Sequence, residues 1–185
     1  MPLKISISWP AGSGKSSVIK EIVARTWFAT ADVGQIYRKQ AAEMGMTISE
    51  FNDYLDNNLE EDLNMEKRFQ ELVENSEKDI IVSWRLWFKF VKDLVSIWLD
   101  VSPKEWAKRI MSDTGRGWQE KKNTSLEDVI KTNKERMERV KDRLKLLYWV
   151  DFTDTSNYTK VIDTTGKSFE EVLGEVMEYV EECKK

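Results

Sequence analysis

The chain has 185 residues, of which 41% are hydrophobic and 34% are charged, and it contains no histidine. This length and composition predict one soluble globular domain with a core of its own. The formal net charge of −4, from 29 basic and 33 acidic residues, argues against a surface for duplex nucleic acid. The absence of histidine excludes serine–histidine and cysteine–histidine catalysis and histidine-based metal sites. Any chemistry must therefore come from lysine, arginine, carboxylates, hydroxyls and the backbone.

The sequence contains no apolar run that approaches the roughly 20 residues needed to span a bilayer. The N-terminal residues lead directly into a strand-like pattern, without the long apolar segment of an export signal. Cys183 is the sole cysteine, so no internal disulfide can form. We therefore expect a cytoplasmic protein with no membrane partner.

Short apolar runs rich in isoleucine and valine predict buried strands. Such runs cover residues 3–8, 79–83, 94–101 and 160–164, and a fifth strand is expected over residues 27–31. Longer amphipathic stretches fill the gaps between them and predict helices. Strands that alternate with helices indicate a parallel sheet covered on both faces. With no internal repeat or linker, residues 1–185 are expected to form one domain.

Several helix starts are visible as N-cap residues. Thr47 with Glu50, and Ser168 with Glu171, fit the capping-box pattern. Pro103 follows Ser102, a combination typical of the first turn of a helix. A further N-cap serine at position 125 opens a long stretch with apolar residues at helical spacing, which predicts a long helix.

The segment ISWPAGSGKSS, residues 7–17, resembles the phosphate-binding loop pattern G-x-x-x-x-G-K-[ST]. It supplies Gly14, Lys15 and Ser16, but it has Trp9 in place of the first glycine. The loop follows a predicted strand and precedes a predicted helix, where backbone N–H groups suit a polyphosphate. Lys15 would reach the terminal phosphates, and the Ser16 hydroxyl would bind Mg²⁺. The alternative is an ordinary turn rich in glycine and serine.

Two separate arginines are candidates for phosphate binding. Arg38 ends the segment DVGQIYR, residues 32–38, about one turn into the next predicted helix. Arg85 lies just beyond the predicted third strand, at the edge of the sheet where ligands of open α/β folds collect. A guanidinium can bind a phosphate through two hydrogen bonds. The alternative for each is a solvated surface charge.

Three further arginines stand three and four residues apart in the predicted long helix, so they share one helix face. They are Arg136, Arg139 and Arg143. A row of guanidiniums could neutralise charge on a transferring phosphoryl group, as an arginine finger does. The alternative is an exposed helix with salt bridges, because acidic residues are interleaved with the arginines.

Taken together, these features resemble the compact cytidylate kinases, a branch of the nucleoside monophosphate kinases, over almost the whole chain. The segments that carry the resemblance are EMGMTISEFN (43–52), DLNMEKRFQEL (62–72), RLWF (85–88), IWLDVSPKEWAKRI (97–110) and DTSNYTKVIDTT (154–165). The resemblance implies an α/β three-layer P-loop kinase fold: a five-stranded parallel sheet, helices on both faces and a helical lid. It also implies substrate-binding helices at about 33–76 and a lid at about 112–148.

The implied activity is phosphorylation of CMP or dCMP by ATP with Mg²⁺, in a monomer whose partners are small nucleotides. ATP would bind at Ala11, Gly12, Ser13, Gly14, Lys15, Ser16 and Ser17, with the metal at Ser16. The acceptor would bind at Asp32, Gly34, Tyr37, Arg38, Asp62, Arg68 and Arg85. The catalytic residues would be Lys15, Arg136, Arg139 and Arg143. Only the resemblance favours cytosine, so another acceptor such as AMP stays open.

The chain departs from the family at four tryptophans. Trp9, Trp27, Trp84 and Trp149 stand where the family has glycine. Trp27 and Trp149 fall at predicted helix ends, where left-handed backbone favours glycine. Trp84 is expected to project near the substrate cleft. The chain has 8 glycines and 8 tryptophans, although an average composition would give roughly 13 glycines. Ser83 replaces a residue that is commonly acidic.

Three explanations of these tryptophans stay open. They are ordinary core aromatics; or they mark a drifted, non-catalytic nucleotide-binding module; or they are UGA codons that the organism reads as glycine. Four independent replacements of glycine by the bulkiest residue are improbable as drift, which favours recoding. In that case the cellular protein would carry an intact phosphate-binding loop.

Overall fold

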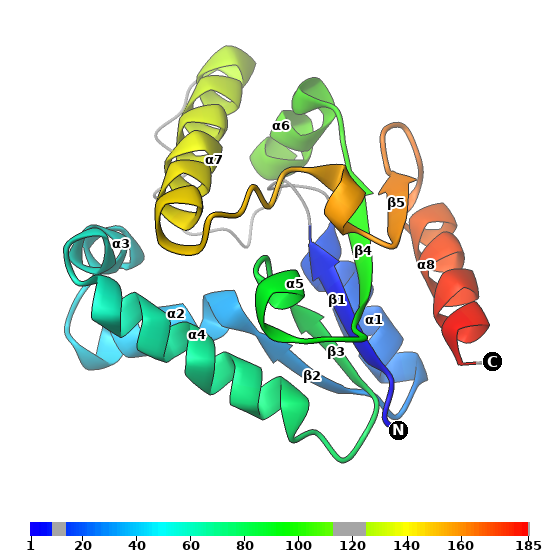
Figure 1. Ribbon diagram of the computed structural model, residues 1–185. Coiled ribbons are helices and arrows are strands. Elements are labelled where there is room, and N and C mark those ends of the chain that lie inside the picture. The colour runs from blue at the N-terminus through cyan, green and yellow to red at the C-terminus, as the bar shows by residue number, and fades with distance from the viewer. Residues whose placement is uncertain (9–13, 113–124, 185) are drawn as a thin grey trace.

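The computed structural model describes residues 1–8, 14–112 and 125–184. Its centre is a five-stranded parallel sheet of order β2-β3-β1-β4-β5 (Figure 1). The strands are β1 (Lys4–Ser8), β2 (Ala29–Asp32), β3 (Ile80–Ser83), β4 (Val95–Asp100) and β5 (Lys160–Asp163). The helices are α1 (Lys15–Arg25), α2 (Val33–Glu43), α3 (Ile48–Asn57), α4 (Leu59–Glu74), α5 (Trp87–Phe90), α6 (Pro103–Ser112), α7 (Leu126–Tyr148) and α8 (Phe169–Cys183), with a 3₁₀ turn η1 (Thr155–Asn157).

Two apolar clusters cover the two faces of the sheet and confirm the expected three-layer α/β fold. On one face, Ile5 and Ile7 of β1 pack with α1 and α8. On the other face, the sheet packs against α4, α5 and the C-terminal part of α7. The alternate residues of β1 point to this second face, where the Ser6 and Ser8 hydroxyls donate to the Trp84 carbonyl oxygen at 2.8 and 2.6 Å. This period of two explains why serines interrupt the apolar run of β1.

All five predicted strands are confirmed, each within two residues of its predicted start. The capping boxes at Thr47 and Ser168 are both formed. The Ser125 side chain accepts from the Asp128 amide and begins α7. The short helix α5 was not predicted, because four aromatic and basic residues carry no helical period.

One of the two expected left-handed helix ends is confirmed and the other is wrong. Trp149 caps α7 with φ 58° and ψ 35°. Trp27 is not among the residues with positive φ. The chain leaves α1 through an extended Thr26, whose hydroxyl donates to the Ile22 carbonyl oxygen and accepts from the Phe28 amide. That side chain ends the helix without a left-handed residue.

The helices between β2 and β3 form a small lobe with its own apolar cluster (Figure 1). The lobe contains α2, α3 and α4, the segment expected to bind the acceptor. The expected lid begins at the end of α6 and continues through α7; its residues 113–124 lie outside the described residues. In the described part of the chain, no helix has the length and apolar character of a membrane span.

Candidate active site

The strand order defines where a ligand should bind. Strand β1 lies between β3 and β4, so the chain leaves β1 at the point where the sheet order reverses direction. In open α/β sheets, ligands bind beyond the carboxyl ends of the strands at this point. The predicted phosphate-binding loop, residues 9–13 with Gly14 and the start of α1, follows β1 here; Trp9, Ala11, Gly12 and Ser13 lie outside the described residues.

The described end of this loop has the geometry of an anion site. Gly14 adopts φ 86°, a left-handed conformation that favours glycine, and it directly precedes the first residue of α1. The first N–H groups of a helix lack partners within the helix and bind anions. Ser16 and Ser17 are exposed on this first turn. The turn therefore fits the predicted role in ATP binding.

Lys15 is buried and held at the ends of two neighbouring strands. Its Nζ donates to the Ser83 hydroxyl at 2.8 Å and lies 3.8 Å from a carboxylate oxygen of Asp32. Ser83 ends β3 and Asp32 ends β2. These contacts aim the ammonium group along the carboxyl edge of the sheet. Ser83, whose role the sequence left open, is a positioning residue for Lys15.

Asp32, Gly34 and Arg38 form one local unit at the start of α2. The Asp32 carboxylate accepts from the Gly34 amide at 2.8 Å and caps the helix. A side chain at Gly34 would place its Cβ 3.1 Å from that carboxylate and 3.2 Å from the Arg38 guanidinium. Arg38 is exposed and lies over Gly34. The structure thus brings Arg38 to the same sheet edge as Lys15.

Three of the predicted arginines gather near the end of β3. Burial, together with the positive charges of Arg136 and Arg143, lowers the pKa of Arg85 to about 10. The Nε atom of Arg143 is buried, with no hydrogen-bond partner among the described residues. Guanidiniums so close to one another repel unless an anion lies between them. This cluster suits a phosphate.

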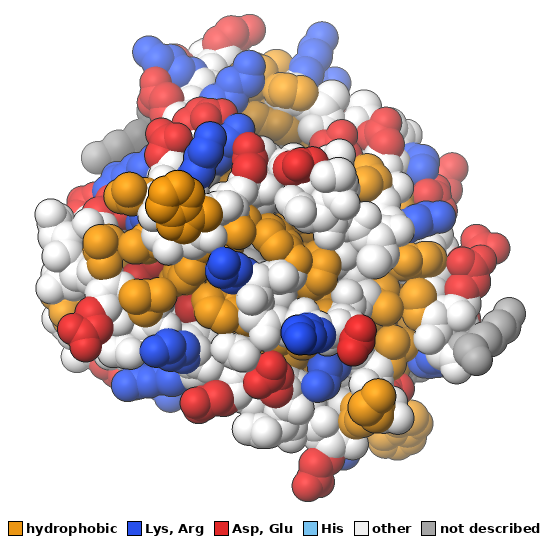
Figure 2. All heavy atoms as spheres, in the orientation of Figure 1, with side chains coloured by type: hydrophobic (Ala, Val, Ile, Leu, Met, Phe, Trp, Pro, Cys, Tyr) orange, Lys and Arg blue, Asp and Glu red, His pale blue; other side chains and the backbone are white. Residues whose placement is uncertain are grey.

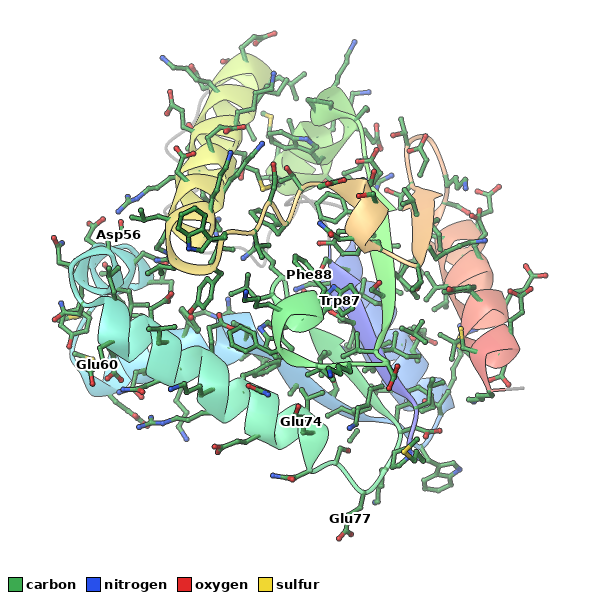
Figure 3. The ribbon with its side chains drawn as sticks, viewed as in Figure 1. Asp56, Glu60, Glu74, Glu77, Trp87 and Phe88 are labelled. Carbon is green, nitrogen blue, oxygen red and sulfur yellow. The ribbon has the colours of Figure 1, made fainter. Side chains whose placement is uncertain are left out.

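Arg139 has a different position. Its guanidinium forms ion pairs with Asp53 and Asp56 of α3, and these carboxylates raise the pKa of Arg139. Arg143 also pairs with Asp56, at 3.2 Å. Figure 3 labels Asp56 on α3, and charged side chains of both signs crowd the region of α7 in Figure 2. These ion pairs join α7 to the α2–α4 lobe, and they hold the side chain of Arg139 against α3.

Two buried carboxylates face this cluster from α4. The Tyr37 hydroxyl lies 3.0 Å from Asp62 and 3.1 Å from Glu66, and the Trp84 indole N–H donates to Glu66 at 2.6 Å. Burial raises the pKa of Glu66 to about 7, against the opposing effect of the Trp84 hydrogen bond. Burial also raises the pKa of Tyr37. Asp62 and Tyr37 therefore lie together, as predicted for acceptor binding.

Trp84 is buried among these groups, although it was expected to project near the cleft. Its side chain is 1% exposed and packs in the cluster between the sheet, α4 and α5. Of the residues predicted to bind the acceptor, which all lie in the described part of the chain, Arg68 alone does not join the others. It is exposed, and it follows Glu66 by two positions, about 200° around α4.

The sequence reasoning missed Glu66. It lies four residues after Asp62, so both carboxylates lie on one face of α4. That spacing was the signal that could have found it.

The opposite end of the sheet edge is hollow. A cavity of about 470 Å³ lies beyond β4 and β5. Its lining includes Asp100, Trp106, Met137 and Thr165. The cavity is large enough for a nucleobase and is closed on one side by the same α7 that carries the arginines.

The metal site predicted at Ser16 rests on a single protein ligand. Among the described residues, no group of three or more acidic or cysteine side chains could hold a metal ion. Mg²⁺ prefers oxygen ligands and usually binds through one or two protein groups plus substrate phosphates. The exposed Ser16 hydroxyl on the first turn of α1 fits that mode of binding.

Comparisons with known proteins agree with this geometry. The family model described as an AAA domain matches residues 5–141. The cytidylate kinase of Methanocella arvoryzae is 30% identical over 181 residues, which cover 98% of this chain and 98% of the relative. The chain belongs to the cytidylate kinase-like P-loop kinases.

Two other similarities place the kinase more broadly. An S-adenosylmethionine-dependent nucleotide dehydratase from Lacinutrix mariniflava is 32% identical over 183 residues; they cover 97% of this chain but 36% of that relative. The chain thus spans about a third of that protein's length. The shikimate kinase of Bacteroides thetaiotaomicron superposes with a TM-score of 0.62 at 12% identity, covering 97% of this chain and 98% of that one. This likeness concerns the fold.

Proposed function

We propose that this kinase transfers the γ-phosphoryl group of ATP to CMP or dCMP, giving ADP and the corresponding diphosphate. The observation that carries the proposal is that Lys15 donates to Ser83 at the end of β3, two residues before Arg85, which lies near Arg136 and Arg143. The cytidylate kinase relatives support cytosine as the acceptor base. Both substrate sides lie on one chain, so a monomer suffices.

The proposed mechanism consists of positioning and charge neutralisation. An oxygen of the acceptor phosphate attacks the γ-phosphorus atom of ATP, and ADP leaves with the bridging oxygen. Lys15 stabilises the terminal phosphates of ATP, and the arginine cluster holds the acceptor phosphate. Mg²⁺, bound with the Ser16 hydroxyl, supplies further positive charge. No covalent enzyme intermediate is needed, because alignment supplies much of the acceleration.

The two nucleotides would use opposite ends of the sheet edge. The adenine of ATP would bind in the cavity beyond β4 and β5, which Trp106 and Met137 line. The acceptor would bind between β3 and the α2–α4 lobe, where Arg38 and Arg85 lie. Helix α7 contributes to both ends, so its closure would exclude water from the phosphates.

A second candidate function is supported by Trp84. Because its indole is buried among the acceptor residues, a chain that truly carries tryptophan here would bind ATP without phosphorylating an acceptor. The codons at the four tryptophan positions of the gene distinguish the two functions. UGA at codons 9, 27, 84 and 149 favours the kinase with glycine restored, whereas UGG at codons 9 and 84 favours the non-catalytic module.

The function is tested by a coupled assay of ADP release with each of the four ribonucleoside monophosphates and with dCMP. It should compare the chain with the printed sequence, which we call the tryptophan form, with Trp9→Gly/Trp84→Gly, which we call the glycine form. We expect the glycine form to turn over CMP and dCMP much faster than the tryptophan form. A faster reaction with AMP than with CMP would show that the acceptor base is adenine and not cytosine. ATP binding without turnover in both forms would exclude the kinase.

A further inference from the structure

The Trp84 indole occupies a site with the properties of a nucleobase pocket. The ring is stacked on Phe90, with centroids 5.7 Å apart and planes inclined by 11°. Phe69 meets it edge-on at 4.9 Å. Its one polar group, the indole N–H, donates to Glu66 at 2.6 Å. A flat ring, stacked on an aromatic face and joined to a carboxylate through an N–H group, is bound as an amino-substituted base would be.

The pocket also has the right neighbours for a nucleotide. Trp84 directly precedes Arg85 at the end of β3. The negative charge of Glu66 partly offsets the lowering of the Arg85 pKa, and the positive charge of Arg143 partly offsets the raising of the Glu66 pKa. These charges therefore lie close to one another. The base-like ring and the guanidinium cluster are therefore adjacent. A phosphate on the arginines would place its own base toward Glu66.

The buried carboxylates need an explanation that stability does not give. Asp62 and Glu66 are both buried on α4, and a buried carboxylate is unfavourable unless its oxygens accept hydrogen bonds. Tyr37, Trp84 and, at 3.5 Å, Tyr148 donate to them here. An apolar residue at position 66 would be buried without that requirement. The carboxylate is better suited to recognising a donor group on a ligand.

We propose that the Trp84 indole occupies the place of the acceptor's pyrimidine base, so that tryptophan closes the acceptor site and glycine at position 84 opens it to CMP. This proposal rests on the proposed function and names the base subsite within it. Removal of a large buried side chain can leave a cavity that binds a free aromatic ring; cavities of about 150 Å³ do so. With glycine, Glu66 would accept from the exocyclic amino group of cytosine.

The same contact would determine specificity. The ionised carboxylate of Glu66 accepts from the 4-amino group of cytosine and repels the 4-carbonyl oxygen of uracil. Burial raises the pKa of Glu66 to about 7, so the preference is measured above that pH. A glutamine at position 66 keeps one acceptor oxygen and adds an N–H donor, so it can pair with either base. Glu66→Gln in the Trp84→Gly background should therefore remove the preference for CMP over UMP.

The test measures binding of CMP and UMP by isothermal titration calorimetry, with ATP binding and circular dichroism as checks of the fold. We expect no CMP binding to the tryptophan form. Trp84→Gly should bind CMP at least tenfold more tightly than UMP. Trp84→Phe is the matched control: it keeps a ring in the pocket and should stay closed. If Trp84→Gly does not fold, Trp84→Ala opens a similar space and is measured in its place.

The outcomes separate this inference from the proposed function. CMP binding by the glycine form, Trp9→Gly/Trp84→Gly, without turnover supports the base pocket and contradicts the kinase. CMP turnover by the tryptophan form, or equal CMP affinity in Trp84→Phe and Trp84→Gly, overturns the pocket and leaves the kinase intact. A folded, ATP-binding Trp84→Gly or Trp84→Ala that does not bind CMP also overturns it. An unchanged CMP preference in Trp84→Gly/Glu66→Gln contradicts the role of Glu66.

Discussion

The two ends of the sheet edge, which we propose bind the two nucleotides, differ in how tryptophan is placed. Beyond β4 and β5 there is a cavity of about 470 Å³, lined by Trp106 and Met137. Between β3 and the α2–α4 lobe, Trp84 is 1% exposed and fills the space beside Glu66. Tryptophan thus lines one end and fills the other. Under the proposed function, a tryptophan that forms a wall leaves room for a nucleotide, whereas one that fills the space does not.

From this comparison we predict that Lys15 stabilises the phosphates of ATP independently of the residue at position 84, which fills the acceptor end. Lys15→Ala in the glycine form should lower kcat by about 10²–10³-fold, because it removes a charge that stabilises the transition state. ADP release and a denaturation curve measure activity and folding together. Lys20→Ala, an exposed lysine on the same helix, is the matched control and should leave kcat unchanged. Equal turnover with and without Lys15 would contradict the phosphate-binding assignment.

A second prediction concerns the charge state of the filled end. Glu66 has its pKa raised from 4.5 to about 7 by burial, so between these pH values the folded protein keeps a proton that the unfolded chain releases. The contribution of Glu66 to the free energy of unfolding should therefore be fully present below pH 4.5 and fall by roughly 3 kcal/mol as pH rises to 7. Above pH 7 this contribution stays constant.

Urea denaturation at several pH values measures this slope in the tryptophan form. Glu66→Gln should flatten the slope, whereas Glu60→Gln, an exposed position on the same helix, should leave it in place. The exposed capping carboxylate of Glu171 has a lowered pKa, so its contribution is lost only in acid below this range. A slope that persists in Glu66→Gln would show that another group titrates.

The arginines should separate the two ends kinetically. In the glycine form, Arg38→Ala should raise KM for the monophosphate by about tenfold or more and leave KM for ATP nearly unchanged, because one charged hydrogen bond to the acceptor is lost. Arg139→Ala should mainly lower kcat, which requires Arg139 to leave Asp53 and Asp56 as the lid closes. Initial rates with each substrate varied in turn provide both constants. The reverse pattern would mean that the two sides are wrongly assigned.

The smallest expected effects compare two exposed tryptophans at helix ends. Trp149 is left-handed and 90% exposed, whereas Trp27 is 97% exposed without positive φ. Trp149→Gly should raise the free energy of unfolding by about 0.5–1 kcal/mol, because it relieves left-handed strain. Trp27→Gly should lower it by about 0.5–1 kcal/mol, because glycine adds freedom to the unfolded chain. Shifts of equal sign would show that backbone conformation does not decide the result.

The sequence was informative where local rules dominate. The strands followed from their apolar runs, and the caps at Thr47, Ser125 and Ser168 followed from side chains that bond within three residues. The prediction of a left-handed helix end at Trp27 was wrong because Thr26 ends α1 by its own hydrogen bonds. Such bonds are a local alternative to a left-handed glycine. Both termini look the same when only the break in periodicity is considered.

The site was less predictable because its contacts join distant segments. The bond from Lys15 to Ser83 spans 68 positions, and that from Arg143 to Asp56 spans 87. No periodicity encodes such pairs. Glu66 could have been found from its spacing to Asp62, but its contact with Trp84 depends on how α4 packs on β3.

Helix α7 has 23 residues, so as a straight rod it extends for about 35 Å. Midway along it Met137 lines the hollow pocket, and at its C-terminal end Tyr148 lies 3.5 Å from Asp62. If ATP and CMP bind as proposed, one helix contacts both sites, so that binding of one nucleotide should affect the affinity for the other. Whatever factor ATP adds to the affinity for CMP, CMP must return to ATP, since coupling between two binding sites is reciprocal. Release of the diphosphate product should accordingly lower the affinity of the protein for ADP.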